Sequence, residues 1–94
     1  MLFDELEQKS VVILGFGTEG QATYEFIRQR WPEKQVAIAD RRNLSAFDLP
    51  LQQRLQSDSA CALSLGAHYL DHLTDYDVII KTPGLPASKM FGLP

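Results

Sequence analysis

Cysteine is almost absent from this sequence of 94 residues, which contains only Cys61. A single thiol cannot form a disulfide within the chain, so a reducing, cytoplasmic location is expected, with Cys61 as a small hydrophobic residue at a strand start. Long apolar runs are absent too, and the beginning MLFDELEQ is acidic where a secretion signal would be basic. We therefore expect no membrane insertion.

An excess of positive charge is also missing, because the formal net charge is −3. A general nucleic-acid partner would need a basic face to neutralise phosphates, so we expect none. The sequence has no phosphate loop ending in Gly-Lys-Ser/Thr, no nucleophile-and-base arrangement and no credible pair of carboxylates. His68 and His72 have no third ligand at a suitable spacing, so no metal site is predicted. ATP hydrolysis therefore cannot be assigned to this sequence, and no catalytic residue is predicted.

What is present is the pattern of one α/β domain spanning residues 1–94. Three apolar runs predict buried parallel strands, at Val11–Leu14, at Val36–Ala39 ending on Asp40, and at Val78–Ile80. A weaker fourth strand is expected at Cys61–Leu65. Because the runs are apolar on both faces, the predicted sheet is covered by helices on both sides.

A helix is expected between the first two strands. Thr18 and Gln21 have the spacing of a capping box, and Pro32 marks the stop. The apolar positions that recur at helical intervals are Ala22, Phe26 and Ile27. Two shorter helices are expected around Leu51 to Leu55 and around Tyr69 to Leu73. Strand, helix and strand together predict a βαβ unit and a Rossmann-like parallel sheet.

The most informative segment is the glycine motif that directly follows the first strand, Gly15-Phe16-Gly17-Thr18-Glu19-Gly20. In this context Gly15 permits the tight turn, Gly17 lets a phosphate approach the backbone, and Gly20 lets the helix pack on the strand. Free N–H groups at the start of the helix favour an anion. The alternative is that the three glycines serve only the turn and the packing.

Acidic and basic side chains follow the second strand. Asp40 lies twenty residues beyond Gly20, where a carboxylate commonly accepts hydrogen bonds from a ribose or a base. Arg41 and Arg42 suit a phosphate or a flat ring, although a solvated pair is an equal alternative. Glu19 is unexpected in the loop, because a carboxylate roughly 6 Å from a phosphate would cost about 3 kcal/mol. We therefore expect either that Glu19 points away from the anion or that the phosphates lie further along the loop.

A turn follows the last strand and has the sequence Lys81-Thr82-Pro83-Gly84-Leu85-Pro86. It belongs to the same carboxyl edge of the sheet as the glycine motif and Asp40, and ligands of open α/β sheets bind at that edge. Thr82 offers a hydroxyl there, and Gly84 allows close approach of the backbone. The stretch from Ala87 to Pro94 has no periodicity. This is typical of a domain excised from a longer chain, and a flexible natural tail is the alternative.

In these segments the sequence resembles the first domain of the Mur ligases, over roughly residues 9 to 86. The resemblance is greatest to members that add D-glutamate to UDP-N-acetylmuramoyl-L-alanine. It implies binding of the UDP part of that substrate, and so a role in peptidoglycan synthesis, cell shape and division. The site residues that it implies for the pyrophosphate are Gly17, Thr18, Glu19, Thr82, Pro83 and Gly84, and those for the uracil are Asp40, Arg41 and Arg42. Glu19 departs from the Ser or Thr that the family often has before the third glycine.

The resemblance also implies further domains. The family's ATP loop, Mg²⁺ ligands, carbamylated lysine and D-glutamate site belong to central and C-terminal domains that this sequence lacks, so the chain alone is expected to be inactive. The full enzyme would activate the substrate carboxylate as an acyl phosphate for attack by the amine of glutamate. Two other hypotheses stay open at this point. One is an NAD(P)-binding domain of an oxidoreductase or regulatory sensor, with Asp40 on the ribose, and the other is an interaction module that binds no nucleotide.

Overall fold

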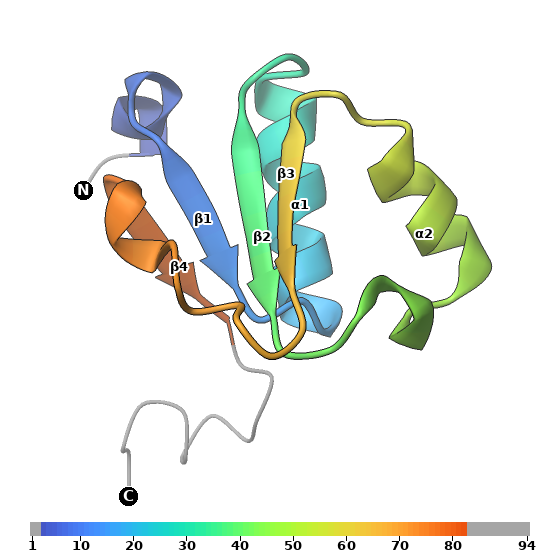
Figure 1. The fold of residues 1–94 in the computed structure, drawn as a ribbon. Coiled ribbons are helices and arrows are strands. Elements are labelled where there is room, and N and C mark those ends of the chain that lie inside the picture. The colour runs from blue at the N-terminus through green and yellow to red at the C-terminus, as the bar shows by residue number, and fades with distance from the viewer. Residues whose placement is uncertain (1–2, 83–94) are drawn as a thin grey trace, which may run out of the picture.

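The computed structural model describes residues 3–82 of the chain. They form a four-stranded, all-parallel sheet with the strand order β3-β2-β1-β4 (Figure 1). The strands are β1 (Val11–Leu14), β2 (Val36–Asp40), β3 (Cys61–Leu65) and β4 (Val78–Lys81). All four predicted strands are confirmed, and so is the Rossmann-like α/β fold class.

One face of the sheet packs against two helices, α1 (Thr18–Arg30) and α2 (Leu49–Gln56). The register places Val11 level with Val36 and with Val78, so alternate residues of neighbouring strands share this face. α1 contributes Tyr24 and Ile27 to the shared core, both about 1% exposed. α2 begins at the cap residue Asp48, whose carboxylate accepts the N–H of Leu51 at 2.9 Å.

The opposite face of the sheet packs against the segment 66–76, which follows β3. Val12, Ala37 and Ala39 are buried there, and the side chains of this segment that pack on them are Tyr69, Leu73 and Tyr76. The helix expected around Tyr69 to Leu73 is wrong. The backbone instead turns with bonds between residues three apart, such as the N–H of Tyr69 to the carbonyl of Gly66, and ends in the 3₁₀ turn η3 (Leu73–Asp75).

Three-residue spacing of hydrogen bonds also shapes the other short elements. These are η1 (Phe3–Gln8) before β1 and η2 (Leu44–Ala46) between β2 and α2.

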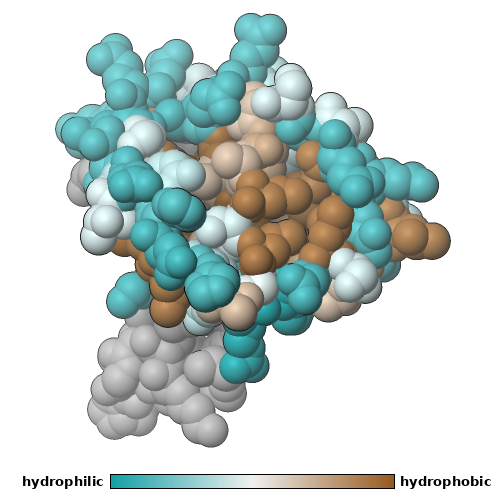
Figure 2. All heavy atoms as spheres, in the orientation of Figure 1, coloured by the Kyte–Doolittle hydropathy of each residue, from teal (hydrophilic) through white to brown (hydrophobic). Residues whose placement is uncertain are grey.

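In the view of Figure 1, hydrophobic side chains gather over β3 and beside α2 (Figure 2), where Leu63 of β3 is 37% exposed. Within the described residues, β3 and β4 are the edge strands.

The expectation that the last strand is buried on both faces is wrong. Ile79, in the middle of β4, is 40% exposed. The cause is position in the sheet, because among residues 3–82 this strand has a neighbour on only one side, β1. In the middle of the sheet, all of β2 and the first three residues of β1 are buried, as the apolar runs predict, and Leu14 is partly buried.

The expected capping box of α1 is also wrong. The cap residue is Gly17, no side-chain bond caps it among the described residues, and Thr18 is already the first helical residue. Gln21 does not return to the cap and donates instead to the carbonyl of Phe16 at 3.3 Å. The inward face differs too, because Phe26 is 58% exposed. Tyr24 is buried in its place, since its hydroxyl finds a partner in Asp58.

The other end of α1 is tied down by a buried ion pair. Arg28 Nε lies 2.9 Å from Asp58 Oδ2, and both side chains are only 8% exposed. Arg28 also donates to the main-chain carbonyls of Trp31, at 3.1 Å, and Lys34, at 2.7 Å. The helix ends at Arg30, just before Pro32, as predicted.

Candidate site at the carboxyl edge of the sheet

Three segments that are far apart in the sequence meet at the carboxyl ends of the strands. Gly15, directly after β1, donates its N–H to the carbonyl of Ala39 at 2.7 Å. Thr82, directly after β4, donates its N–H to the carbonyl of Leu14 at 3.0 Å and its hydroxyl to the carbonyl of Gly15 at 2.6 Å. The glycine loop is therefore held from both sides by its neighbouring strands.

The three glycines of the loop have different surroundings. Gly15 has a φ of +93°, a backbone conformation that favours glycine. A Cβ on Gly20 would lie 2.2 Å from the carbonyl oxygen of Gly15, so no side chain fits where α1 crosses the turn. A Cβ on Gly17 would meet no heavy atom of the described residues within 4 Å. The loop is thus closed at Gly15 and Gly20 and open at Gly17.

The opening at Gly17 coincides with the start of α1. The first N–H groups of a helix have no partner within the helix, and the helix dipole makes this end attractive to an anion. Because Gly17 supplies no side-chain cap, these groups are not satisfied in the usual way. Thr18 and Glu19 are both exposed, and Glu19 stands on the first turn of the helix.

Asp40 faces the glycine loop from the end of β2. Its Oδ2 accepts the N–H of Phe16 at 2.7 Å and Arg42 Nη2 at 2.8 Å, and its Oδ1 accepts the backbone N–H of Arg42 at 2.8 Å and Arg42 Nε at 3.0 Å. Burial, at 4% exposure, opposes ionisation of this carboxyl group. The hydrogen bonds from Arg42 and Phe16 outweigh that effect and hold the pKa of Asp40 below its ordinary value.

Sequence reasoning missed two aromatic residues that support this arrangement. Phe16, inside the glycine motif, is fully buried, and its ring meets those of Tyr24 and Phe47 edge to face, with centroids 5.9 and 6.0 Å away. The guanidinium of Arg42 lies over the Phe47 ring at 4.8 Å. An aromatic residue between two glycines was the available signal, because such a side chain needs a buried place.

Asn43 and Gly66 were missed as well. Gly66 donates its N–H to the carbonyl of Asp40 at 3.0 Å, which brings the chain after β3 to the same edge. Its φ is +90°, and a Cβ on it would lie 2.7 Å from Asn43 Oδ1. A glycine that closes a predicted strand was the signal for this crossing.

The remaining predicted site residues are placed as follows. Arg42 is ion-paired with Asp40, with its side chain 45% exposed, so the alternative of two solvated arginines does not hold for this one. Arg41 and Lys81 are exposed. Pro83 and Gly84 lie outside the described residues. The structure therefore brings together the glycine loop, Asp40, Arg42 and Thr82.

His68 and His72 are exposed, and Cys61 is partly buried. His68 and His72 are 86% and 69% exposed, and each lies 3.4 Å from the aspartate three residues later. No group of three potential metal ligands occurs among residues 3–82. Burial raises the pKa of the Cys61 thiol to about 11, so this group is protonated and unreactive at neutral pH.

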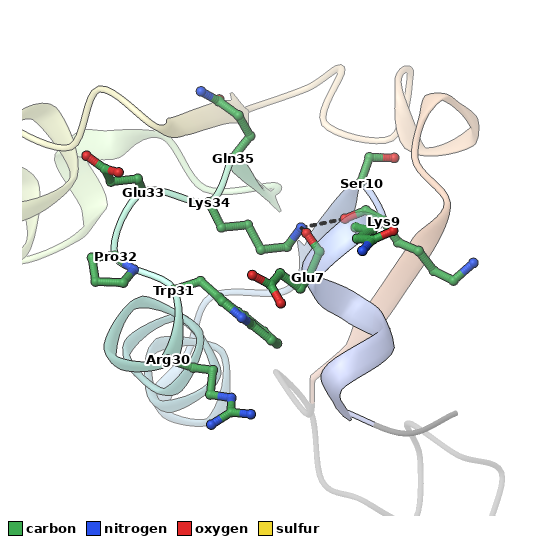
Figure 3. Close-up of a pocket in the computed structure, with 10 residues that line it drawn as sticks. Glu7, Lys9, Ser10, Arg30, Trp31, Pro32, Glu33, Lys34 and Gln35 are labelled. Atoms are coloured by element: carbon green, nitrogen blue, oxygen red, sulfur yellow. Dashed lines mark hydrogen bonds between the residues drawn. The ribbon is translucent and has the colours of Figure 1, made fainter.

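A shallow pocket of about 570 Å³ lies at the opposite, amino edge of the sheet (Figure 3). Its walls come from residues 7–10 before β1 and residues 30–35 before β2. Lys34 Nζ reaches across it to the carbonyls of Lys9, at 2.6 Å, and Glu7, at 3.2 Å. This pocket contains none of the predicted site residues.

No helix in the described part of the chain is long and apolar enough to cross a membrane.

A parallel sheet with a glycine loop leading from its first strand into a helix defines a Rossmann-like α/β domain. Comparison with known families is more specific. The family model "Mur ligase MurD-like, N-terminal domain" matches residues 9–91, and the chain belongs to this family.

Three curated relatives show the extent of the similarity. A UDP-N-acetylmuramoylalanine--D-glutamate ligase from Acidobacterium capsulatum is 30% identical over 96% of this chain and 20% of its own length. The enzyme of the same name from Syntrophus aciditrophicus is 26% identical over 92% of this chain and 18% of its own. A UDP-N-acetylmuramoyl-L-alanine--L-glutamate ligase from Xanthomonas campestris is 29% identical over 90% and 17%. The chain thus spans about a fifth of their length. No solved structure matches the chain.

Proposed function

We propose that this chain binds the UDP portion of UDP-N-acetylmuramoyl-L-alanine, as the N-terminal domain of a cytoplasmic ligase that adds D-glutamate in peptidoglycan synthesis. The observation that carries the proposal is the open backbone at Gly17, at the uncapped start of α1. A helix start of this kind, beside a loop without side chains, is suited to a pyrophosphate. Membership of the MurD-like family supports UDP as the source of that pyrophosphate.

The proposed contacts combine the described positions with the family resemblance. The amides of Gly17, Thr18 and Glu19 meet the pyrophosphate, and so does Thr82 at the end of β4. The family resemblance alone assigns Pro83 and Gly84 to the same contact. The hydroxyl of Thr82 already donates to Gly15, so Thr82 acts by shaping the loop as well. Asp40, Arg41 and Arg42 lie on the uracil side, because they follow the neighbouring strand β2.

The chemistry is proposed to reside in other parts of a longer protein. ATP and Mg²⁺ are expected to bind central and C-terminal domains, which would supply the catalytic groups. The relatives support this division, because the chain covers only about a fifth of each ligase. They also differ in the D or L form of the glutamate in their names. A difference of that kind fits an amino-acid site outside the domain that they share.

Calorimetric titration of the chain with UDP-N-acetylmuramoyl-L-alanine, UDP and NAD tests the proposal. Binding of both uridine ligands and no heat with NAD is the expected result. Binding of NAD alone would replace the proposal by a dinucleotide-binding domain. Silence from all three ligands would contradict nucleotide binding by this chain.

A further inference from the structure

Phe47 lies where the glycine loop and the residues after β2 meet. It is 8% exposed. One contact of its ring is with Phe16 of the glycine loop, edge to face, with the centroids 6.0 Å apart. The other is with Arg42, whose guanidinium carbon lies 4.8 Å from the ring centroid. A single ring therefore touches both the loop proposed for the pyrophosphate and a side chain proposed for the uracil.

Main-chain hydrogen bonds hold Phe47 in place from both sides. Its N–H donates to the carbonyl of Leu44 at 3.1 Å, and its carbonyl accepts Gln52 Nε2 at 2.7 Å. The next residue, Asp48, caps α2. Because the ring is buried and the backbone on both sides of it is hydrogen-bonded, Phe47 offers Arg42 a fixed surface in the free protein.

Asp40 and Phe47 hold the guanidinium of Arg42 in different ways. Its Nε and Nη2 donate to the two carboxylate oxygens of Asp40, at 3.0 and 2.8 Å. The same group lies over the ring of Phe47, where the negative face of an aromatic ring attracts a cation. The Arg42 side chain is 45% exposed, and an ion pair that open to water holds an arginine only weakly. The ring is therefore a second support that keeps the guanidinium in one position.

A guanidinium held in this way keeps donors for a ligand. Arginine carries five side-chain N–H groups and no acceptor. Among the described residues, Asp40 accepts two of the five, which leaves three. A group that only donates suits the carbonyl oxygens of uracil, and its bonds cost less entropy when it is ordered before the ligand arrives.

We propose that Phe47 is a positioning residue of the nucleotide site, whose ring holds the Arg42 guanidinium in place for the uracil. The inference rests on the proposed function, in which Arg42 lies on the uracil side. It adds a residue to which neither the glycine motif nor the family resemblance gives a role.

The test compares UDP with inorganic pyrophosphate as ligands of the chain and of its Phe47→Leu variant. Pyrophosphate has no ribose or base, so it reports on the loop alone. Leucine keeps an apolar contact for Phe16 but has no aromatic face for a cation. The variant should bind UDP about threefold to fivefold more weakly, the loss expected for one cation–π contact, and should bind pyrophosphate as the wild type does. Phe26→Leu, the same substitution at an exposed position of α1, is the matched control and should leave both affinities unchanged.

A double-mutant cycle shows whether the effect passes through Arg42. In an Arg42→Ala background, Phe47→Leu should cause no further loss of UDP affinity, because the cation that the ring holds is already absent. The same loss in both backgrounds would mean that the ring acts independently of Arg42 and would overturn the inference.

The other outcomes each have a distinct meaning. Equal weakening of UDP and pyrophosphate by Phe47→Leu would make Phe47 a packing residue of the loop and overturn the inference, and so would unchanged affinity for UDP. If Arg42→Ala binds UDP as the wild type does, the inference fails while nucleotide binding stands. If the wild-type chain binds neither ligand, the proposed function itself fails, an outcome visible before any variant is made.

Nuclear magnetic resonance of the wild-type chain keeps the inference testable if Phe47→Leu does not fold. Nuclear Overhauser contacts between the Arg42 side chain and the ring protons of Phe47 are expected in the free protein, because the two groups are in contact without a ligand. Contacts that are missing, or that arise only after UDP is added, would contradict a guanidinium positioned in advance.

Discussion

Gly17 and Gly20 belong to one motif, yet the structure predicts opposite results when each is changed to alanine. In Gly20→Ala the new methyl would lie 2.2 Å from the carbonyl oxygen of Gly15, which is backbone and cannot rotate away. In Gly17→Ala the methyl would enter open space, at a φ of −80° that alanine adopts readily. One substitution therefore tests packing and the other tests access for a ligand.

The magnitudes follow from these distances. Overpacking of a buried site costs about 1–3 kcal/mol, and Gly20→Ala belongs at the upper end because both α1 and the turn must shift. For a domain of this size that cost lowers the Tm by at least about 10 °C. In Gly17→Ala, the loss of glycine as cap residue costs up to about 1 kcal/mol. The lower entropy of the unfolded chain returns about 0.4–1 kcal/mol, so the net change is close to zero.

Thermal melts and calorimetric titration with UDP separate the two effects. Gly17→Ala should melt with the wild type and bind UDP at least about tenfold more weakly, because its methyl occupies the path of the phosphates. Gly20→Ala should melt early. Wild-type affinity in Gly17→Ala would refute the approach of the pyrophosphate at this residue. A wild-type Tm in Gly20→Ala would refute the contact with Gly15.

Three further predictions concern charged and buried groups. Glu19→Gln should strengthen UDP binding by no more than about threefold at low salt. Salt at 0.5 M, where the Debye length is about 4 Å, should remove this gain in affinity, because exposed charges are screened. A larger gain that persists in salt would place Glu19 against the phosphates. Tyr24→Phe should lower the free energy of unfolding by about 1.5–3 kcal/mol in urea titrations without changing UDP affinity, because the hydrogen bond from its hydroxyl to the Asp58 carboxylate is lost. A loss of affinity would couple Tyr24 to the site. Folding lowers the pKa of Asp40. The stabilising contribution of its carboxylate is therefore complete above about pH 4, the unfolded pKa, and disappears as the pH falls through the lower folded pKa. If acid lowers the stability of Asp40→Asn as much as that of the wild type, this prediction is wrong.

Alkaline pH gives a separate test of the buried tyrosine. Burial and the neighbouring Asp58 raise the pKa of Tyr24 from 10.0 to about 12. A raised folded pKa means that the stabilising contribution of the protonated hydroxyl is complete below pH 10 and is lost as the pH rises through about 12. The wild type should therefore lose more stability than Tyr24→Phe over this range in urea titrations. Equal losses would show that the hydroxyl titrates as if it were exposed.

The four strands were predictable because their apolar runs are short, continuous and bounded by glycine or polar residues. The faces of α1 were not. Phe26 fits the apolar spacing but is exposed, and Tyr24 is buried because Asp58, 34 residues later, accepts its hydroxyl. Contacts between residues so far apart leave no periodic trace in the sequence. The exposure of Ile79 was unpredictable for the same reason, since an edge strand and a central strand can have the same composition.

The residues of the candidate site likewise fall into those that the sequence could predict and those that it could not. Its glycines were readable because the backbone needs the absence of a side chain at fixed positions, and a Cβ at Gly20 or a φ of +93° at Gly15 leaves few substitutes. The role of Asp40 was not readable, because a carboxylate at that position can face a ribose or the loop. In this structure Arg42 donates three N–H groups to Asp40 and so holds the carboxylate toward the loop. A site that uses main-chain amides for its anion can tolerate an unusual side chain such as Glu19, provided that the side chain leaves the opening at Gly17 clear.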